Sequence, residues 1–162
     1  DLAALSMVVA LGSAVLALFV ALAVWLRPLE PGVLALQFAA TPRAFAEVVH
    51  AWGPDGLARY RAQLPFDFLL LGAYAAFGVC VARRTALFAA LPAPLRTLAG
   101  AALPLAAAFD AVENLLHAWL TEAPRFGIGW VYALSAAMSG AKWLALVLFA
   151  ALCCAALLRQ PR

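Results

Sequence analysis

Four polar side chains recur at helical spacing inside a long apolar run, F-D-A-V-E-N-L-L-H: Asp110, Glu113, Asn114 and His117. Positions i, i+3, i+4 and i+7 lie on one stripe of a helix, so the four side chains share a face. Carboxylates and imidazoles are the groups that transfer protons in enzymes. A charged side chain deep in a membrane costs at least about 2–3 kcal/mol, so this stripe needs partners or a purpose.

A second polar stripe lies in the last apolar segment, where Tyr132, Ser135, Ser139 and Lys142 follow at i, i+3, i+7 and i+10. Lys142 is the only lysine of the chain. Helical side chains lean toward the N-terminus of their helix, which brings the Lys142 ammonium toward the level of Asp110. We therefore predict an ion pair between Asp110 and Lys142 and a polar interior between the two stripes.

The predicted polar interior is open toward the outer face of the membrane, the side opposite the cytoplasm. Asp67 and Tyr74, at i and i+7 of an earlier segment, share a face and belong to it. We expect Asp67 and His117 at its mouth, with Arg59, Arg61 or His50 as further candidates. The predicted ligand-binding residues are Asp67, Tyr74, Asp110, Glu113, Asn114, His117, Ser135, Ser139 and Lys142.

Two readings of this polar cluster remain open. One lysine cannot neutralise three carboxylates, so either a carboxyl carries a proton or another group binds. In the structural alternative, a buried Asp–Lys pair with Asn and Ser hydrogen bonds fixes the register between helices. In the functional reading, Glu113 and Asn114, left without a charge partner, are where function is expected.

Specific chemistries receive less support. The catalytic candidates for acid/base chemistry are Asp110, Glu113 and His117, but no complete catalytic motif is present. A di-iron centre needs a second E-x-x-H unit, and here Glu113 and His117 are i, i+4. His117 is a weak metal candidate, and haem or chlorophyll ligation by His117 or His50 is a weak alternative. No cofactor is predicted.

The composition is that of an integral membrane protein. Of 162 residues, 67% are hydrophobic and 12% charged, whereas soluble domains are about half apolar and a quarter charged. The net charge of +3 comes from arginines spread over loop ends, so nucleic acid is not an expected partner. The chain begins with Asp1 rather than Met, so we expect further residues before it in the natural protein.

Four apolar segments have the length of roughly 20 residues that a membrane span needs, about 3–26, 65–83, 97–120 and 129–158. The first is too long for a cleavable signal. We expect a single domain, an all-α transmembrane four-helix bundle.

In the connection 27–64 we expect an amphipathic helix that begins at Thr41-Pro42. This helix either lies on the membrane surface or caps the bundle. A turn is predicted at Gly53-Pro54-Asp55-Gly56, and Pro65 is expected to open the second span.

The arginines predict the orientation. The loop from Arg83 to Arg96 and the C-terminus carry five arginines and no acidic residue, whereas the connection 27–64 carries four arginines and three acidic residues. Cytoplasmic loops are enriched in Lys and Arg. We therefore expect both termini and the loop from Arg83 to Arg96 in the cytoplasm.

Two stretches resemble a group of uncharacterised small bacterial four-span membrane proteins: H-A-W-G-P-D-G-L-A-R-Y-R-A-Q-L-P-F-D-F and F-D-A-V-E-N. The resemblance covers roughly residues 36–120. Its features, W-G-x-x-G-x-x-x-Y, an Asp opening span two and D-x-x-E-N, match Trp52, Gly53, Gly56, Tyr60, Asp67, Asp110, Glu113 and Asn114. It implies a four-span fold in a bacterial inner (cytoplasmic) membrane and a site, but no reaction, and His117 and Lys142 are not features of the group.

Two classes of function follow. The first is a non-enzymatic protein, either an accessory subunit among other membrane subunits or a binder of a lipid-like ligand, with membrane lipids as partners. The second is an intramembrane acid/base enzyme or proton-linked carrier that acts on a lipid or isoprenoid through Asp110, Glu113 and His117. The small size and the lack of a catalytic motif favour the first.

Overall fold

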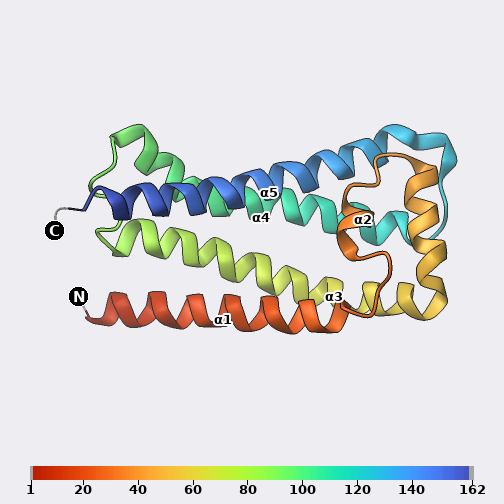
Figure 1. The fold of residues 1–162 in the computed structure, drawn as a ribbon, viewed down its shortest axis with the longest axis horizontal. Helices are drawn as coiled ribbons and strands as arrows, with labels where there is room; N and C mark the ends of the chain where they lie inside the picture. The colour runs from red at the N-terminus through yellow and green to blue at the C-terminus, as the bar shows by residue number, and fades with distance from the viewer. Residues whose placement is uncertain (1, 161–162) are drawn as a thin grey trace.

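The computed structural model describes residues 2–160 and is all-α over that range (Figure 1). Its elements are α1 (Leu2–Leu26), α2 (Val33–Gln37), α3 (Pro42–Arg84), α4 (Ala93–Leu120), the 3₁₀ turn η1 (Phe126–Ile128) and α5 (Gly129–Leu158). Helices α1, α3, α4 and α5 are each long and apolar enough to cross a membrane. The expected four-helix bundle is confirmed.

The four long helices pack in the order in which they occur in the chain. Helix α1 packs against α3, α3 against α4, and α4 against α5, whereas α1 and α5 make few direct contacts. A Cβ added to Gly78 of α3 would lie 2.7 Å from the Cβ of Leu103 on α4, so these two helices approach closely. Large apolar side chains also point outward, such as Leu16 and Leu144, as expected for helices surrounded by lipid.

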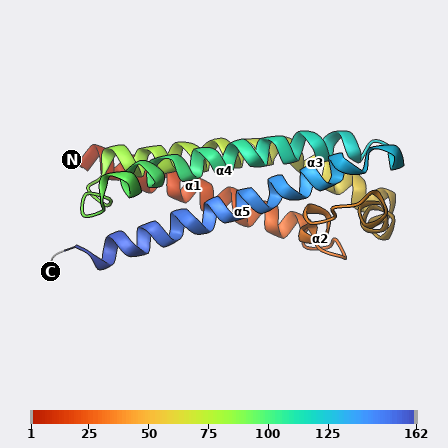
Figure 2. The same ribbon diagram turned by 90° about the horizontal axis from the view of Figure 1, so that it is seen from above.

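The two ends of the bundle differ (Figure 1). Both chain termini lie at one end, together with the connection between α3 and α4. The other end is covered by the cap, residues 27–52, which includes α2 and the first part of α3. Seen from above, α5 runs obliquely, meeting α4 near the cap and diverging from it toward the C-terminus (Figure 2).

The cap helix forms for the reasons that the sequence indicates. The Thr41 hydroxyl accepts a hydrogen bond from the Ala44 backbone N–H at 3.2 Å, and Pro42 occupies the first helical turn. Phe45 and Trp52 are buried on one side of the helix, whereas the polar residues Arg43, Glu47 and His50 are exposed. The amphipathic helix therefore caps the bundle.

The predicted turn at Gly53–Gly56 and the helix start at Pro65 are both wrong. Gly53 (φ 65°, ψ −176°) makes a single kink, after which one helix runs to Arg84. Pro54 fits directly after the kink because its missing N–H has no partner in a first helical turn. Pro65 lies inside the helix, where it leaves the carbonyl of Arg61 without its helical donor.

Candidate functional site

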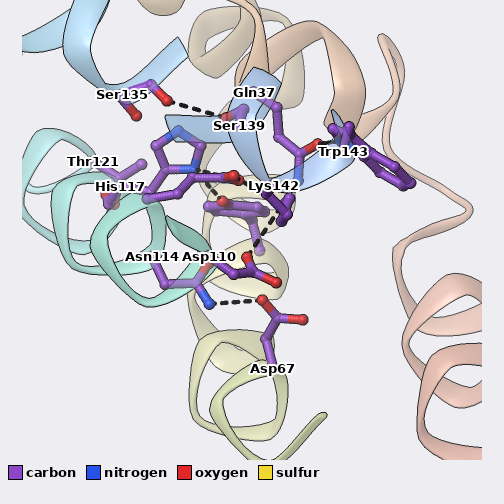
Figure 3. A network of polar contacts seen from close by, with 12 residues as sticks. Gln37, Asp67, Asp110, Asn114, His117, Thr121, Ser135, Ser139, Lys142 and Trp143 are labelled. Carbon is purple, nitrogen blue, oxygen red and sulfur yellow. Dashed lines mark hydrogen bonds and ion pairs between the residues drawn. The ribbon is translucent and has the colours of Figure 1, made fainter. Parts of the chain in front are cut away.

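The polar stripes of α4 and α5 face each other, and Lys142 joins them (Figure 3). The Lys142 ammonium lies 3.0 Å from Asp110 Oδ1 and 2.8 Å from Glu113 Oε2. These three residues are at most 5% exposed. The predicted Asp110–Lys142 pair is confirmed. The expectation that Glu113 lacks a charge partner is wrong, because Glu113 lies one turn beyond Asp110 on the same face and Lys142 reaches both.

Helix α3 supplies further partners for the polar cluster. The Tyr74 hydroxyl donates to Asp110 Oδ2 at 3.0 Å. Asp67, which is half-buried, accepts a 2.6 Å hydrogen bond from Asn114 Nδ2 at its Oδ2 atom (Figure 3). The shared face of Asp67 and Tyr74, predicted from their spacing, is therefore turned toward α4.

His117 does not lie at an accessible mouth, in contrast to the prediction. Its side chain has no exposed surface, since the cap residue Phe45 packs against the ring at a centroid distance of 5.6 Å. The Tyr60 hydroxyl forms a 2.6 Å hydrogen bond with His117 Nδ1, and Glu113 Oε1 lies 3.9 Å from the same atom. His117 is thus part of the contact between the cap end and the bundle.

The other candidates for the mouth are engaged elsewhere. Arg59 donates to the Trp25 carbonyl at 2.9 Å, and the Trp25 indole donates back to the Arg59 carbonyl. Arg61 donates to the Ala118 carbonyl at 2.8 Å. His50 is exposed on the cap. None of these three side chains points its charge at Lys142 or its carboxylate partners.

Ser139 of α5 lies within hydrogen-bonding distance of the Glu113 carboxylate on α4. Ser139 donates to the Ser135 carbonyl of its own helix at 3.1 Å, and both serines are almost fully buried (Figure 3). Small side chains at these positions let the α5 backbone approach α4 closely. The sequence placed Ser135 and Ser139 correctly in the interior.

The residues of W-G-x-x-G-x-x-x-Y hold the cap in place. The Trp52 indole donates to the Pro31 carbonyl at 2.6 Å, and a Cβ added to Gly56 would lie 2.8 Å from Trp52 Cβ. Tyr60 carries the hydroxyl that bonds His117. The motif therefore links the cap to the polar interior, a role of Tyr60 that the spacing of polar residues did not reveal.

A groove of about 410 Å³ borders the polar cluster between α1 and α5, with α3 and α4 behind it. Its polar lining is Gln37, Gln63, Asp67, Tyr74, Asp110 and Lys142, and its apolar lining includes Val15, Phe19, Leu22, Phe77, Leu103, Leu146 and Phe149. The predicted ligand-binding residues divide into two sets. Asp67, Tyr74, Asp110 and Lys142 line the groove, and Glu113, Asn114, His117, Ser135 and Ser139 do not.

The groove explains which residues sequence reasoning missed. Gln37 and Gln63 lie outside the two polar stripes, in the connection between the first two predicted spans. The Gln37 side-chain oxygen accepts a 3.1 Å hydrogen bond from the Trp143 indole, which joins α2 to α5 beside the groove (Figure 3). The only sign of Gln37 in the sequence was that it stands as a single glutamine within an apolar stretch.

Within residues 2–160, no group of three or more His, Cys, Asp and Glu side chains is arranged to hold a metal ion. His117, the weak metal and haem candidate, has Nδ1 bonded to Tyr60, and its ring does not line the groove. Comparison of the chain with protein-family models, curated proteins and solved structures finds no match.

Replacing Tyr60 with phenylalanine is expected to lower the free energy of unfolding by about 1–2 kcal/mol, because His117 Nδ1 would remain buried without its partner. Tyr132→Phe is the matched control, since its hydroxyl accepts only a 3.2 Å bond from the Arg125 N–H in a loop. Denaturant titration of the detergent-solubilised protein measures both changes. Equal losses in the two variants would contradict a specific role for the Tyr60–His117 bond.

Proposed function

We propose that this protein is a membrane-embedded binder of a lipid-like amphiphile, which lies in the groove between α1 and α5. The observation that carries the proposal is the continuity of this groove, which joins buried ionic groups at one end to an apolar channel at the other. Its volume of about 410 Å³ falls in the range of small-molecule sites, roughly 300–1,000 Å³.

The groove matches an amphiphile at both ends. Asp67, Asp110 and Lys142 would face the polar head, whereas Phe19, Leu146 and their apolar neighbours would surround the tail. Because α1 and α5 are barely in contact, a ligand would enter from the lipid between them. The arginine distribution supports placing both termini, and hence the end opposite the cap, in the cytoplasm, and the resemblance to small bacterial four-span proteins favours a bacterial inner membrane.

Acid/base catalysis or proton-linked transport is the second candidate. Asp110 lines the groove and is joined through the Lys142 ammonium to Glu113, which lies 3.9 Å from His117. A molecule in the groove would therefore touch the first group of a connected series of titratable residues. Chemical change of the bound amphiphile, or proton movement coupled to its binding, would favour this candidate.

The test is to fill the groove. Leu146→Trp adds bulk to a groove-lining position, whereas the control Leu144→Trp changes a residue of the same helix that is 70% exposed and outside the groove. We expect mass spectrometry of the purified protein to find an amphiphile retained by the wild type and by Leu144→Trp, and largely lost from Leu146→Trp. Leu22→Trp, on the opposite wall, serves if Leu146→Trp does not fold.

Equal retention in correctly folded Leu146→Trp and Leu144→Trp proteins would overturn the proposal. Recovery of the protein only within a large complex, with no amphiphile dependent on the groove, would favour an accessory subunit instead.

A further inference from the structure

We infer that the amphiphile carries a cationic, hydrogen-bond-donating head, a primary ammonium on a long alkyl chain. This inference rests on the proposed function and specifies the ligand of the same groove. It excludes anionic lipids such as phosphate monoesters and fatty acids.

The first support is the balance of charges around the polar end. Three carboxyl groups, those of Asp67, Asp110 and Glu113, gather around one ammonium, that of Lys142. Lys142 is already shared between Asp110 and Glu113, at 3.0 and 2.8 Å. Asp67 also lines the groove, and no cationic side chain pairs with it in the described part of the chain. An added positive charge would therefore be attracted here, whereas an anion would be repelled.

The second support is that the neighbouring arginines are directed away from the groove. Arg59 and Arg61, on the same helix as Asp67, donate to the backbone carbonyls of Trp25 and Ala118. Neither arginine lines the groove. Recognition of a phosphate or a carboxylate normally uses free Arg or Lys donors, and the groove offers none besides the paired Lys142.

The third support is a set of unused acceptors. Gln63 lines the groove, is 5% exposed and forms no side-chain hydrogen bond with any described residue. Asp67 uses Oδ2 to accept from Asn114, so its Oδ1 is left without a donor from residues 2–160. Both side chains line the groove, and an ammonium has three donors to offer. The Gln63 and Asp67 oxygens are therefore suited to a donating head.

The experiment compares four probes with the same alkyl chain: dodecylammonium, dodecanol, dodecyl phosphate and dodecanoate. Binding to the wild-type protein in phosphatidylcholine nanodiscs is followed by equilibrium dialysis. Uptake by nanodiscs that contain the Leu146→Trp protein measures the partition of each probe into the lipid. This uptake is subtracted from the wild-type value. We expect dodecylammonium to bind at least about tenfold more tightly than either anion, as one charge-assisted hydrogen bond implies.

Asp67→Asn separates the charge from the shape of the groove. We expect it to weaken dodecylammonium binding about tenfold and to weaken dodecanol binding much less, because the neutral hydroxyl loses no charge attraction. Asp55→Asn is the matched control, because Asp55 is exposed and lies outside the groove. The four-probe comparison on the wild type decides the question if Asp67→Asn does not fold.

The outcomes distinguish this inference from the proposed function. The inference of a cationic head would be overturned if all four probes bound equally, or if an anion bound more tightly, and Leu146→Trp removed this binding. The groove would then remain a lipid site. Absence of any binding that Leu146→Trp removes would overturn both.

Discussion

Lys142→Met is expected to lower the free energy of unfolding by about 3–5 kcal/mol, because it leaves Asp110 and Glu113 buried beside each other without their shared cation. Titration with sodium dodecyl sulfate, followed by circular dichroism, measures the change. The matched control is Arg43→Met, which removes a pair of similar length, 2.9 Å to Glu47, whose side chains are 89% and 65% exposed. Exposed pairs contribute little, so Arg43→Met should behave as the wild type.

The triple variant Asp110→Asn, Glu113→Gln, Lys142→Met should recover most of the stability lost in Lys142→Met. No buried charge then remains between α4 and α5, and the amides keep their hydrogen-bonding groups. A Lys142→Met protein as stable as the wild type would show that the ion pairs are not formed. A triple variant that is stable but no longer retains an amphiphile would assign the charges to ligand binding rather than to helix register.

Gly53→Ala is the second substitution with a large expected effect, a loss of about 2–3 kcal/mol. Gly53 combines a positive φ of 65° with an extended ψ of −176°, a backbone conformation that is essentially restricted to glycine. An added Cβ meets nothing within 4 Å, so the cost comes from the backbone and not from crowding. The kink sets the direction of the cap helix, and its loss should expose His117.

The control for Gly53→Ala is Gly140→Ala, in the middle of α5. This glycine also has nothing within 4 Å of an added Cβ, but its backbone is helical. Alanine is about 1 kcal/mol better than glycine inside a helix, so a small gain is expected. Thermal melting in detergent compares the two proteins. Similar melting temperatures for both variants would rule out strain at the kink.

Periodicity predicted the parts of the site that lie along single helices. The i, i+3, i+4, i+7 stripe around Glu113 and the stripe ending at Lys142 both face the interior, and the tilt of helical side chains correctly paired Lys142 with Asp110. The same argument missed the second contact of Lys142, with Glu113. That argument compared only the depths of the residues along their helices, whereas the long lysine side chain reaches two carboxylates that lie a full turn apart.

Features that depend on several elements could not be predicted. The sequence W-G-P-D-G is typical of a turn, and only the packing of Trp52 on Gly56 shows that the chain bends once and continues as a helix. Helix α1 is apolar on every side, so its sequence does not indicate which face borders the groove. The burial of His117 follows from the position of the cap, and no residue pattern within α4 indicates where the cap lies.

The burial of the only lysine has a consequence for chemical labelling. In the folded protein, the side-chain amine of Lys142 lies between two carboxylates and is 5% exposed, so acylating reagents have almost no access to it. Modification of Lys142 therefore requires that a reagent enter the groove and that the ammonium leave its two carboxylate partners. The rate of its acylation, read by mass spectrometry in an intact membrane, should therefore fall when an amphiphile occupies the groove.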